Sequence, residues 1–223
     1  MDNKLIFDLG YFNGNSTKSF LENDYTVIAV ECNPECIDNC NILYKNYIEN
    51  GNLILINKAV SDKDNELIPF YISNNSVWSS CLEKIANRCN ALKFKINVDS
   101  ITLKTLIDTY GCPYFCKIDL EGYDILALNS LKDTNELPKY IQVESECVGD
   151  DDYEIDYLEN LNALHELGYT KFCIQEGSNC IQIEPSNLEY YDYETIKSKI
   201  INTRKHHDFR YAWTFWYDII ATY

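Results

Sequence analysis

The sequence predicts an α/β fold with a mostly parallel sheet and helices on both of its faces. Short apolar runs with strand character alternate with segments of helical periodicity along most of the chain. Consecutive strand–helix units of this kind form a parallel sheet that is covered on both sides. A hairpin predicted near the C-terminus adds an antiparallel element. With 223 residues and no internal repeat or low-complexity linker, we expect one domain spanning residues 1–223.

The first half of the chain predicts three strands, at residues 4–9, 25–31 and 53–57. A short helix is expected over residues 16–23, with Ser16 as its N-cap. A second helix is expected over residues 34–48, because Pro34 suits a first helical turn and Gly51 follows the last apolar residue.

The second half of the chain is less regular. Its predicted strands are residues 66–73, 93–98, 114–120, 140–144, 171–175 and 180–183, of which the last two form a hairpin around residues 176–179. Its predicted helices are residues 102–110, closed by Gly111, and 153–167, closed by Gly168. We expect an irregular stretch at 74–80, a solvated acidic loop at 149–152, and an aromatic tail at 203–223 that packs on the domain.

The chain is strongly acidic, with a formal net charge of −16. Its only arginines are Arg88, Arg204 and Arg210. Proteins bind nucleic acid mainly by neutralising phosphates with Lys and Arg, so nucleic acid is not expected as a partner, and a small or neutral acceptor is favoured. No apolar run approaches the roughly 20 residues of a membrane span, so we expect no membrane contact and a cytoplasmic protein. The sequence does not indicate an oligomeric state.

The chain contains ten cysteines without a regular disulfide framework, so reduced and mostly buried thiols are expected. Cys32, Cys36 and Cys40 are spaced four residues apart. Radical enzymes hold an iron–sulfur cluster with a Cys-x3-Cys-x2-Cys loop, and the second gap here is one residue too long. The three thiols are therefore interpreted as one face of a packed helix.

The strongest local signal lies between Asp8 and Thr17. An apolar strand ends in Asp8, Gly10 and Gly14 follow four residues apart, and a helix begins. Glycine allows the backbone to turn sharply and to approach a ligand closely. The next strand ends in Glu31, whose carboxylate can accept both ribose hydroxyls of an adenosine. This order predicts a site for an adenosyl cofactor; the alternative is a tight turn that binds no ligand.

The same turn differs from a dinucleotide-binding turn. The dinucleotide pattern is Gly-x-Gly-x-x-Gly, in which the second glycine lets pyrophosphate reach the helix N-terminus. Here Phe12 stands two residues after Gly10, and its bulk disfavours pyrophosphate. Asp8 would repel a phosphate, whereas it suits the ammonium of a methionyl group. The turn therefore favours a methionyl adenosine.

A second group of ionisable residues follows a central strand. Lys117, Asp119 and Glu121 alternate along the predicted strand and so share one side of it. Glu144 lies on the neighbouring strand, in an alternating series with Gln142 and Glu146. Open α/β sheets bind ligands at the carboxyl ends of their strands. We expect Asp119, Glu121 and Glu144 to converge there, where they orient a hydroxyl, accept its proton or bind Mg2+; a surface salt bridge is the alternative.

These segments, in this order, resemble the FkbM family of S-adenosylmethionine-dependent methyltransferases over residues 5–175. The matching segments are Asp8-x-Gly10-x-x-x-Gly14-x-x-Thr17, Val30-Glu31-Cys32-Asn33-Pro34, Ala59-Val60-Ser61-Asp62, Ser79-Ser80, Ile101-Thr102-Leu103, Lys117-Ile118-Asp119-Leu120-Glu121-Gly122 and Leu167-Gly168-Tyr169. The resemblance implies a Rossmann-like seven-stranded methyltransferase fold with S-adenosylmethionine as cofactor. It also implies methylation of oxygen, usually a hydroxyl of a sugar or natural product.

The resemblance further implies roles for individual residues. Those assigned to the cofactor are Asp8, Gly10, Asn13, Gly14, Thr17, Glu31, Ser61, Asp62 and Ser80. Within this set Glu31 holds the ribose, Ser61 and Asp62 lie near the adenine, and the residues of the glycine turn surround the methionyl part. Those assigned to the reacting methyl are Lys117, Asp119 and Glu121, to which Glu144 is added from the neighbouring strand.

Two positions depart from the family pattern. Phe12 stands where the family often has Asn, and Asn13 is the residue that would supply the missing polar contact. Cys32 stands where the family often has Pro. In the tail, His206 and His207 precede a run of large aromatic residues. Aromatic rings stack on sugars and histidine acts as a base near neutral pH, although such aromatic residues more commonly cap a core.

The leading hypothesis is an S-adenosylmethionine-dependent O-methyltransferase that acts on a hydroxyl of a sugar, glycan or related small molecule. Asp119 is expected nearest that hydroxyl. Two alternatives remain: a non-catalytic subunit that keeps the adenosyl-binding fold, and a nicotinamide-dependent oxidoreductase, which Phe12 and the missing third glycine disfavour.

Overall fold

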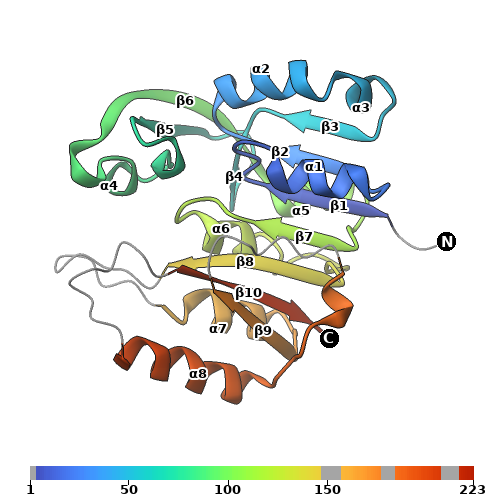
Figure 1. Cartoon of the computed structure of the whole chain (residues 1–223), viewed down its shortest axis with the longest axis vertical. Coiled ribbons are helices and arrows are strands. Elements are labelled where there is room, and N and C mark those ends of the chain that lie inside the picture. The colour runs from blue at the N-terminus through green and yellow to red at the C-terminus, as the bar shows by residue number, and fades with distance from the viewer. Residues whose placement is uncertain (1–3, 147–156, 177–183, 207–215) are drawn as a thin grey trace.

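The computed structural model describes residues 4–146, 157–176, 184–206 and 216–223. Its main element is a seven-stranded sheet with the order β3-β2-β1-β7-β8-β10-β9 (Figure 1). The strands are β1 (Leu5–Leu9), β2 (Thr26–Val30), β3 (Leu53–Ile56), β7 (Phe115–Ile118), β8 (Tyr140–Glu146), β9 (Lys171–Glu176) and β10 (Trp216–Thr222). The first five strands in the sheet order are parallel, and β10 is antiparallel to both β8 and β9. The predicted α/β class and mostly parallel sheet are confirmed.

Helices cover both faces of this sheet (Figure 1). The α-helices beside it are α1 (Asn15–Glu22), α2 (Pro34–Leu43), α3 (Lys45–Glu49), α5 (Leu103–Tyr110), α6 (Asp124–Asn129), α7 (Glu159–Glu166) and α8 (Tyr193–His206). Phe20 and Cys40 bring α1 and α2 into the core on one face. Leu106, Leu128 and Leu164 bring α5, α6 and α7 into the larger core on the other face.

A smaller sheet stands beside the main one, with the order β4-β6-β5 (Figure 1). Its strands are β4 (Ala59–Ser61), β5 (Leu67–Ser73) and β6 (Leu92–Thr102), and the segment between β5 and β6 contains η1 (Ser76–Trp78), α4 (Glu83–Ala86) and η2 (Arg88–Asn90). A short turn, η3 (Pro185–Asn187), precedes α8. The two expected extra strands are present, and β6 is longer than expected because residues 100–102 pair with β4 after residues 92–99 have paired with β5.

Two predicted helix boundaries in the first half were wrong. Gly14, in the left-handed conformation with φ +78°, is the N-cap of α1, so the cap is not Ser16. The helix predicted over residues 34–48 is broken at Tyr44, which has φ −113° and ψ 21° between α2 and α3. The Tyr44 hydroxyl donates to the carbonyl of Gly14 at 3.4 Å, so the break lets the ring reach back to the first turn.

The C-terminal part differs more from the prediction. The described part of the helix predicted over 153–167 begins at Glu159, and residues 153–156 lie outside the described residues. The predicted hairpin strand 180–183 also lies outside them. The described antiparallel partner of β9 is β10, within the stretch expected to be a tail, and α8 was not predicted. Alternate residues of β10 are buried against the larger core, which is the period of a strand.

The three regularly spaced cysteines do not share one helix face. Cys36 and Cys40 are on α2, whereas Cys32 precedes this helix and packs against Cys81 and its neighbours in the small-sheet core. The cysteines among the described residues are free thiols. No helix in the described part of the chain is both long and apolar enough to span a membrane.

Side chains on β1 and β7 alternate between the two faces of the sheet. One face is apolar throughout, whereas the other is apolar at first and becomes polar near the strand ends. Phe7 and Ile118 are fully buried in the larger core. On the opposite face, Ile6 and Phe115 pack below α1 and α2. Two residues further on, this second face becomes polar, with Asp8 on β1 and Lys117 on β7. The change places charged groups at the carboxyl edge of the sheet.

The end of β1 is held against the end of β7 through Gly10. Gly10 has φ +88°, and a Cβ there would overlap the backbone carbonyl of Asp119. We expect Gly10→Ala to lower the free energy of unfolding by about 3 kcal/mol or more, because a backbone group cannot move aside cheaply. Urea denaturation followed by circular dichroism measures this loss.

Gly51→Ala is the matched control for that measurement. Gly51 has φ +77° and nothing within 4 Å of its would-be Cβ, so only the backbone strain remains. We expect a loss of about 1 kcal/mol for this variant. Equal losses in the two variants would show that the close contact between Gly10 and Asp119 does not contribute to the free energy of unfolding.

Candidate functional site

A row of buried polar side chains crosses the sheet near its carboxyl edge. Asp8 on β1 pairs in register with Lys117 on β7, and Lys117 pairs with Gln142 on β8. The exposed fractions of the three residues are 0%, 9% and 1%. The Gln142 amide donates to the Asp218 carboxylate on β10 at 2.6 Å, which extends the row to a fourth strand. Buried polar groups are costly unless they are paired, so this row marks a site where polar groups are needed.

Lys117 supplies the positive charge in this row. Its Nζ lies 2.7 Å from Oδ2 of Asp119. Burial alone would lower the pKa of Lys117, but the nearby carboxylates of Asp119 and Asp8 raise it above its usual range. Lys117 therefore stays protonated and holds Asp119 in place at the end of β7.

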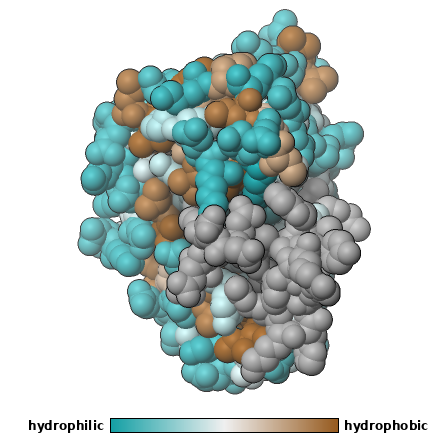
Figure 2. All heavy atoms as spheres, turned by 90° about the vertical axis from the view of Figure 1, so that its left-hand side faces the viewer, coloured by the Kyte–Doolittle hydropathy of each residue, from teal (hydrophilic) through white to brown (hydrophobic). Residues whose placement is uncertain are grey.

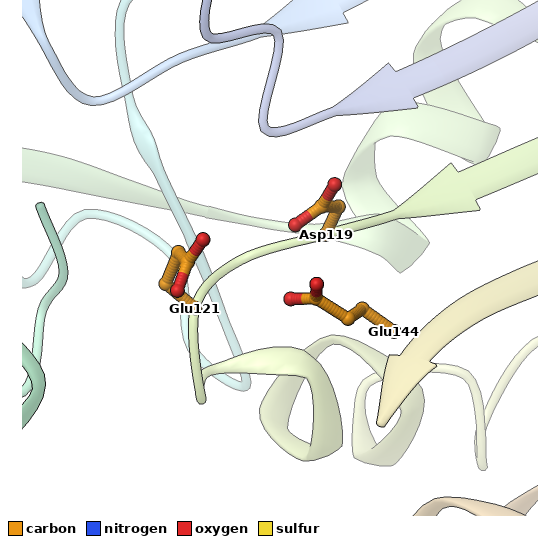
Figure 3. A group of neighbouring side chains, drawn as sticks. All are labelled: Asp119, Glu121 and Glu144. Carbon is orange, nitrogen blue, oxygen red and sulfur yellow. The ribbon is translucent and has the colours of Figure 1, made fainter. Parts of the chain in front are cut away.

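Three carboxylates meet beside this ion pair. One oxygen from each of Asp119, Glu121 and Glu144 lies within 4.8 Å of the other two, and the three side chains point toward one another (Figure 3). The expected convergence is confirmed, but the route differs from the prediction. The strand β7 ends at Ile118, and Glu121 reaches the group through a turn at φ +50°.

Glu144 reaches this group from β8, the strand next to β7. Burial, followed by the negative charges of Asp119 and Glu121, raises the pKa of Glu144 well above its ordinary value. A carboxyl group with a raised pKa is a better proton acceptor once it is ionised. The three carboxylates and Lys117 can therefore orient a hydroxyl and accept its proton.

The turn that carries Glu121 is fixed by two residues outside the group. The buried Asp124 carboxylate accepts the backbone N–H groups of Leu120 and Gly122, each at 3.0 Å. Burial is the largest cause that raises the pKa of Asp124 to about 7. The Ser80 hydroxyl donates to the carbonyl of Glu121 at 2.7 Å. Sequence reasoning missed Asp124, although an aspartate just after a glycine turn and at a helix start is a signal for such bonds.

Asp8 is positioned by the helix that follows the glycine turn. Thr17 on α1 donates to Oδ2 of Asp8 at 2.6 Å. The other oxygen, Oδ1, is buried and has no hydrogen bond within the described part of the chain. Burial raises the pKa of this carboxyl, and Lys117 opposes that shift. A buried acceptor without a donor fits the ammonium of a methionyl group, which supplies N–H donors.

At both glycines of the turn, the space that a side chain would fill is occupied by other parts of the protein. A Cβ at Gly14 would overlap the ring of Tyr11, as a Cβ at Gly10 would overlap the Asp119 carbonyl. Both glycines were expected to allow close approach of a ligand, and the structure gives a packing reason for each. Asn13 in the same turn is exposed, and its Oδ1 accepts the N–H of Asn15 at 3.1 Å.

Glu31 holds the backbone beside the glycine turn. Its Oε2 accepts the N–H of Phe12 at 2.8 Å, and its Oε1 accepts the N–H of Asn33 at 2.7 Å. Burial raises the pKa of Glu31, and these two bonds oppose the shift. An ionised carboxylate has about four acceptor positions, so roughly two remain for a ligand's hydroxyl groups.

The remaining residues assigned from the resemblance lie in or beside the small sheet. Ser61 is buried at the end of β4, and its hydroxyl donates to the carboxylate of Asp62 at 3.3 Å. Ser80 bonds to Glu121 and Leu82. The side chains of Glu146 and His206, and all of residues 207–215, lie outside the described residues. The expectations for the histidines and the aromatic run therefore stay predictions.

Figure 2 shows the side of the molecule at which the parallel strands end. Hydrophilic side chains dominate the coloured surface on this side, with hydrophobic side chains between them. This agrees with the strongly acidic composition of the chain.

Comparison with known proteins shows which family and which solved structures the chain is similar to. The family model described as the methyltransferase FkbM domain matches residues 8–171. No curated protein matches the chain. A SAM-dependent methyltransferase from Archaeoglobus fulgidus is 14% identical with a TM-score of 0.48, covering 100% of this chain and 87% of that one. Precorrin-6y C5,15-methyltransferase from Geobacter metallireducens is 11% identical with a TM-score of 0.45, covering 99% and 80%.

The sequence match spans the glycine turn, the end of β2 and the loop after β7, which are the segments that form the site. It covers well over half of the 223 residues. The chain belongs to the FkbM family of S-adenosylmethionine-dependent methyltransferases.

Proposed function

We propose that the protein transfers the methyl group of S-adenosylmethionine to a hydroxyl oxygen of a sugar, a glycan or a related small molecule. The observation that carries this proposal is the group formed by Asp119, Glu121 and Glu144 beside the protonated Lys117. A hydroxyl must lose its proton as its oxygen becomes methylated. Carboxylates at the carboxyl edge of the sheet are suitable acceptors for that proton.

The cofactor is assigned to the residues around the glycine turn. Asp8 would bind the methionyl ammonium through its buried Oδ1, which has no hydrogen-bond donor among the described residues. Glu31 would accept the ribose hydroxyls with the acceptor positions that Phe12 and Asn33 leave open. The other residues in this assignment are Gly10, Asn13, Gly14 and Thr17 for the methionyl part, and Ser61 and Asp62 for the adenine. Ser80 was also expected at the cofactor, but its hydroxyl bonds to Glu121 and Leu82, and we assign it to the turn after β7 instead.

When bound, S-adenosylmethionine supplies an electrophilic methyl group on a sulfonium. Asp119 would lie nearest the acceptor hydroxyl and orient it for in-line attack. Asp8 and Glu31 would hold the cofactor, which gives up this methyl group and keeps the electron pair of the sulfur–carbon bond. The hydroxyl proton passes to a carboxylate of the group, and the raised pKa of Glu144 suits that residue to this step.

The charge of the chain limits the class of acceptor. A net charge of −16 disfavours nucleic acid and other polyanions, so we assign a neutral small molecule or glycan.

The location of the protein is proposed from its cysteines. Those among the described residues are free thiols. Because reducing compartments keep thiols in this state, we place the protein in the cytoplasm.

A divalent cation is the second candidate role for the three carboxylates. Carboxylate oxygens are the ligands that Mg2+ prefers, and the mutual distances of up to 4.8 Å are compatible with a shared ion after small adjustments. The ammonium of Lys117, however, already lies against Asp119. A second cation at that carboxylate would be repelled by it, so proton acceptance is the role we favour.

The first prediction concerns Asp119. We expect Asp119→Asn to lower kcat by roughly 100-fold or more, because the oxygen that orients the hydroxyl loses its charge. S-adenosylhomocysteine release, screened against sugars and nucleotide sugars, measures turnover, and calorimetry with S-adenosylmethionine is expected to show unchanged affinity. Asp108→Asn is the control, because Asp108 is paired with Lys104 at 2.6 Å on the exposed side of α5. Normal turnover in Asp119→Asn would remove this residue from the mechanism.

The second prediction concerns pH. Because the pKa of Glu144 is raised from 4.5, this carboxyl stays protonated at pH values where an ordinary glutamate is ionised. Turnover should therefore be low in acid and rise as the pH passes the raised pKa, since only the ionised form accepts a proton. In Glu144→Gln this rise should disappear or move to lower pH. An identical pH–rate profile in both proteins would assign proton acceptance to another group.

The third prediction separates the two roles of the carboxylates. After dialysis against EDTA we expect turnover to stay unchanged, because Lys117 rather than a metal ion neutralises Asp119. Loss of turnover that added MgCl2 restores would instead assign Asp119, Glu121 and Glu144 to a metal ion. Melting temperatures recorded with and without EDTA check that chelation leaves the fold intact.

A further inference from the structure

The turn after β7 contains two consecutive residues with positive φ. Glu121 has φ +50°, a left-handed conformation that a non-glycine residue rarely takes, and Gly122 follows with φ +92°. Such a residue costs roughly 1–3 kcal/mol and persists only where the surroundings enforce it. The conformation matters because it points the Glu121 side chain toward Asp119 and Glu144 (Figure 3).

Asp124 bonds to this turn from its C-terminal side. The residue is 5% exposed, and its two oxygens accept the N–H groups of Leu120 and Gly122 separately, each at 3.0 Å. These two N–H groups flank Glu121, so the carboxylate spans the left-handed residue. Hydrogen bonds to a charged acceptor are stronger than neutral ones.

Ser80 bonds to the same turn from the small sheet. Its hydroxyl donates to the Glu121 carbonyl at 2.7 Å and accepts the Leu82 N–H at 2.9 Å. The Ser80 backbone is in turn paired with Tyr71 on β5 by two hydrogen bonds, of 2.8 and 3.1 Å. Three backbone groups of residues 120–122 therefore bond to side chains, and the two side chains come from separate parts of the fold.

We propose that Asp124 and Ser80 are positioning residues, which hold residues 120–122 in the conformation that turns Glu121 toward Asp119 and Glu144. This inference rests on the proposed function, which gives those carboxylates the acceptor's proton. Without the two anchors the turn relaxes toward an ordinary backbone conformation, and the Glu121 carboxylate leaves the group. Neither Asp124 nor Ser80 touches the reacting atoms in this assignment.

The test uses Asp124→Ala and Ser80→Ala in the full chain. Amide hydrogen exchange measured by NMR reports on the turn directly, and we expect the Leu120 and Gly122 amides to exchange faster in Asp124→Ala. Turnover is measured as S-adenosylhomocysteine release with the best acceptor of the sugar panel. We expect kcat to fall roughly 10- to 100-fold in both variants, because a displacement of about 1 Å has effects of this size. Affinity for S-adenosylmethionine should stay unchanged.

Ser100→Ala is the matched control for Ser80→Ala. Ser100 is equally buried, and its hydroxyl likewise accepts one N–H, from Glu66 at 2.9 Å, and donates to one carbonyl, of Lys63 at 2.6 Å. We expect a similar fall in melting temperature in the two serine variants, with normal kcat in Ser100→Ala. A double variant of Asp124→Ala with Glu121→Gln should lose little more activity than Glu121→Gln alone, because both changes act through one carboxylate.

Failure of the positioning role and failure of the proposed function give different results. Unchanged kcat in Asp124→Ala and Ser80→Ala, or fully additive losses in the double variant, would overturn the positioning role while the proposed function stands. Weaker binding of S-adenosylmethionine to Ser80→Ala would assign that serine to the cofactor and overturn its role in the turn. A wild-type protein that methylates no hydroxyl contradicts the proposed function, and unchanged amide exchange at Leu120 and Gly122 would then overturn the positioning role independently.

Discussion

One buried cation, the ammonium of Lys117, balances the carboxylates at the carboxyl edge of the sheet. The ammonium of Lys117 lies 2.7 Å from the Asp119 carboxylate, and the carboxylates of Asp119 and Asp8 are the main influences that keep it protonated despite burial. A buried charge without a partner is strongly destabilising, so neither the lysine nor its carboxylates are stable there alone. Asp8, which we assign to the cofactor, and Asp119, which we assign to the acceptor, therefore share one counter-ion.

Much of the fold and part of the site could be predicted from the sequence, because their signals are local. The glycine turn, the acid at the end of β2 and the apolar strand periods each lie within a few residues, and the structure has them in the expected order. The convergence of Asp119, Glu121 and Glu144 was expected from strand alternation and sheet topology, although β7 ends at Ile118 and a turn brings Glu121 to the group. The turn at Glu121 could not be predicted, because its conformation depends on Ser80, 41 residues away.

The parts that sequence analysis missed depend on contacts between distant segments. The strand β10 was interpreted as an aromatic tail, because the large rings before it concealed the alternation of Tyr217, Ile219 and Ala221. Both glycines of the turn were attributed to a ligand, whereas their missing side chains leave room for Tyr11 and for the Asp119 backbone. Local patterns identify which residues matter, and tertiary packing determines what they touch.

The position of β10 has a consequence for the order in which the protein folds. Within the described residues, β9 joins the sheet through β10, and the bond from Gln142 to Asp218 closes a segment of 76 residues. Closing so long a segment costs chain entropy before any contact compensates for it, which slows folding. The β1–β2–β3 units, whose strands pair with near neighbours in sequence, can therefore form first, and the pairings of β7 with β1 and of β10 with β8 join distant segments and are expected later.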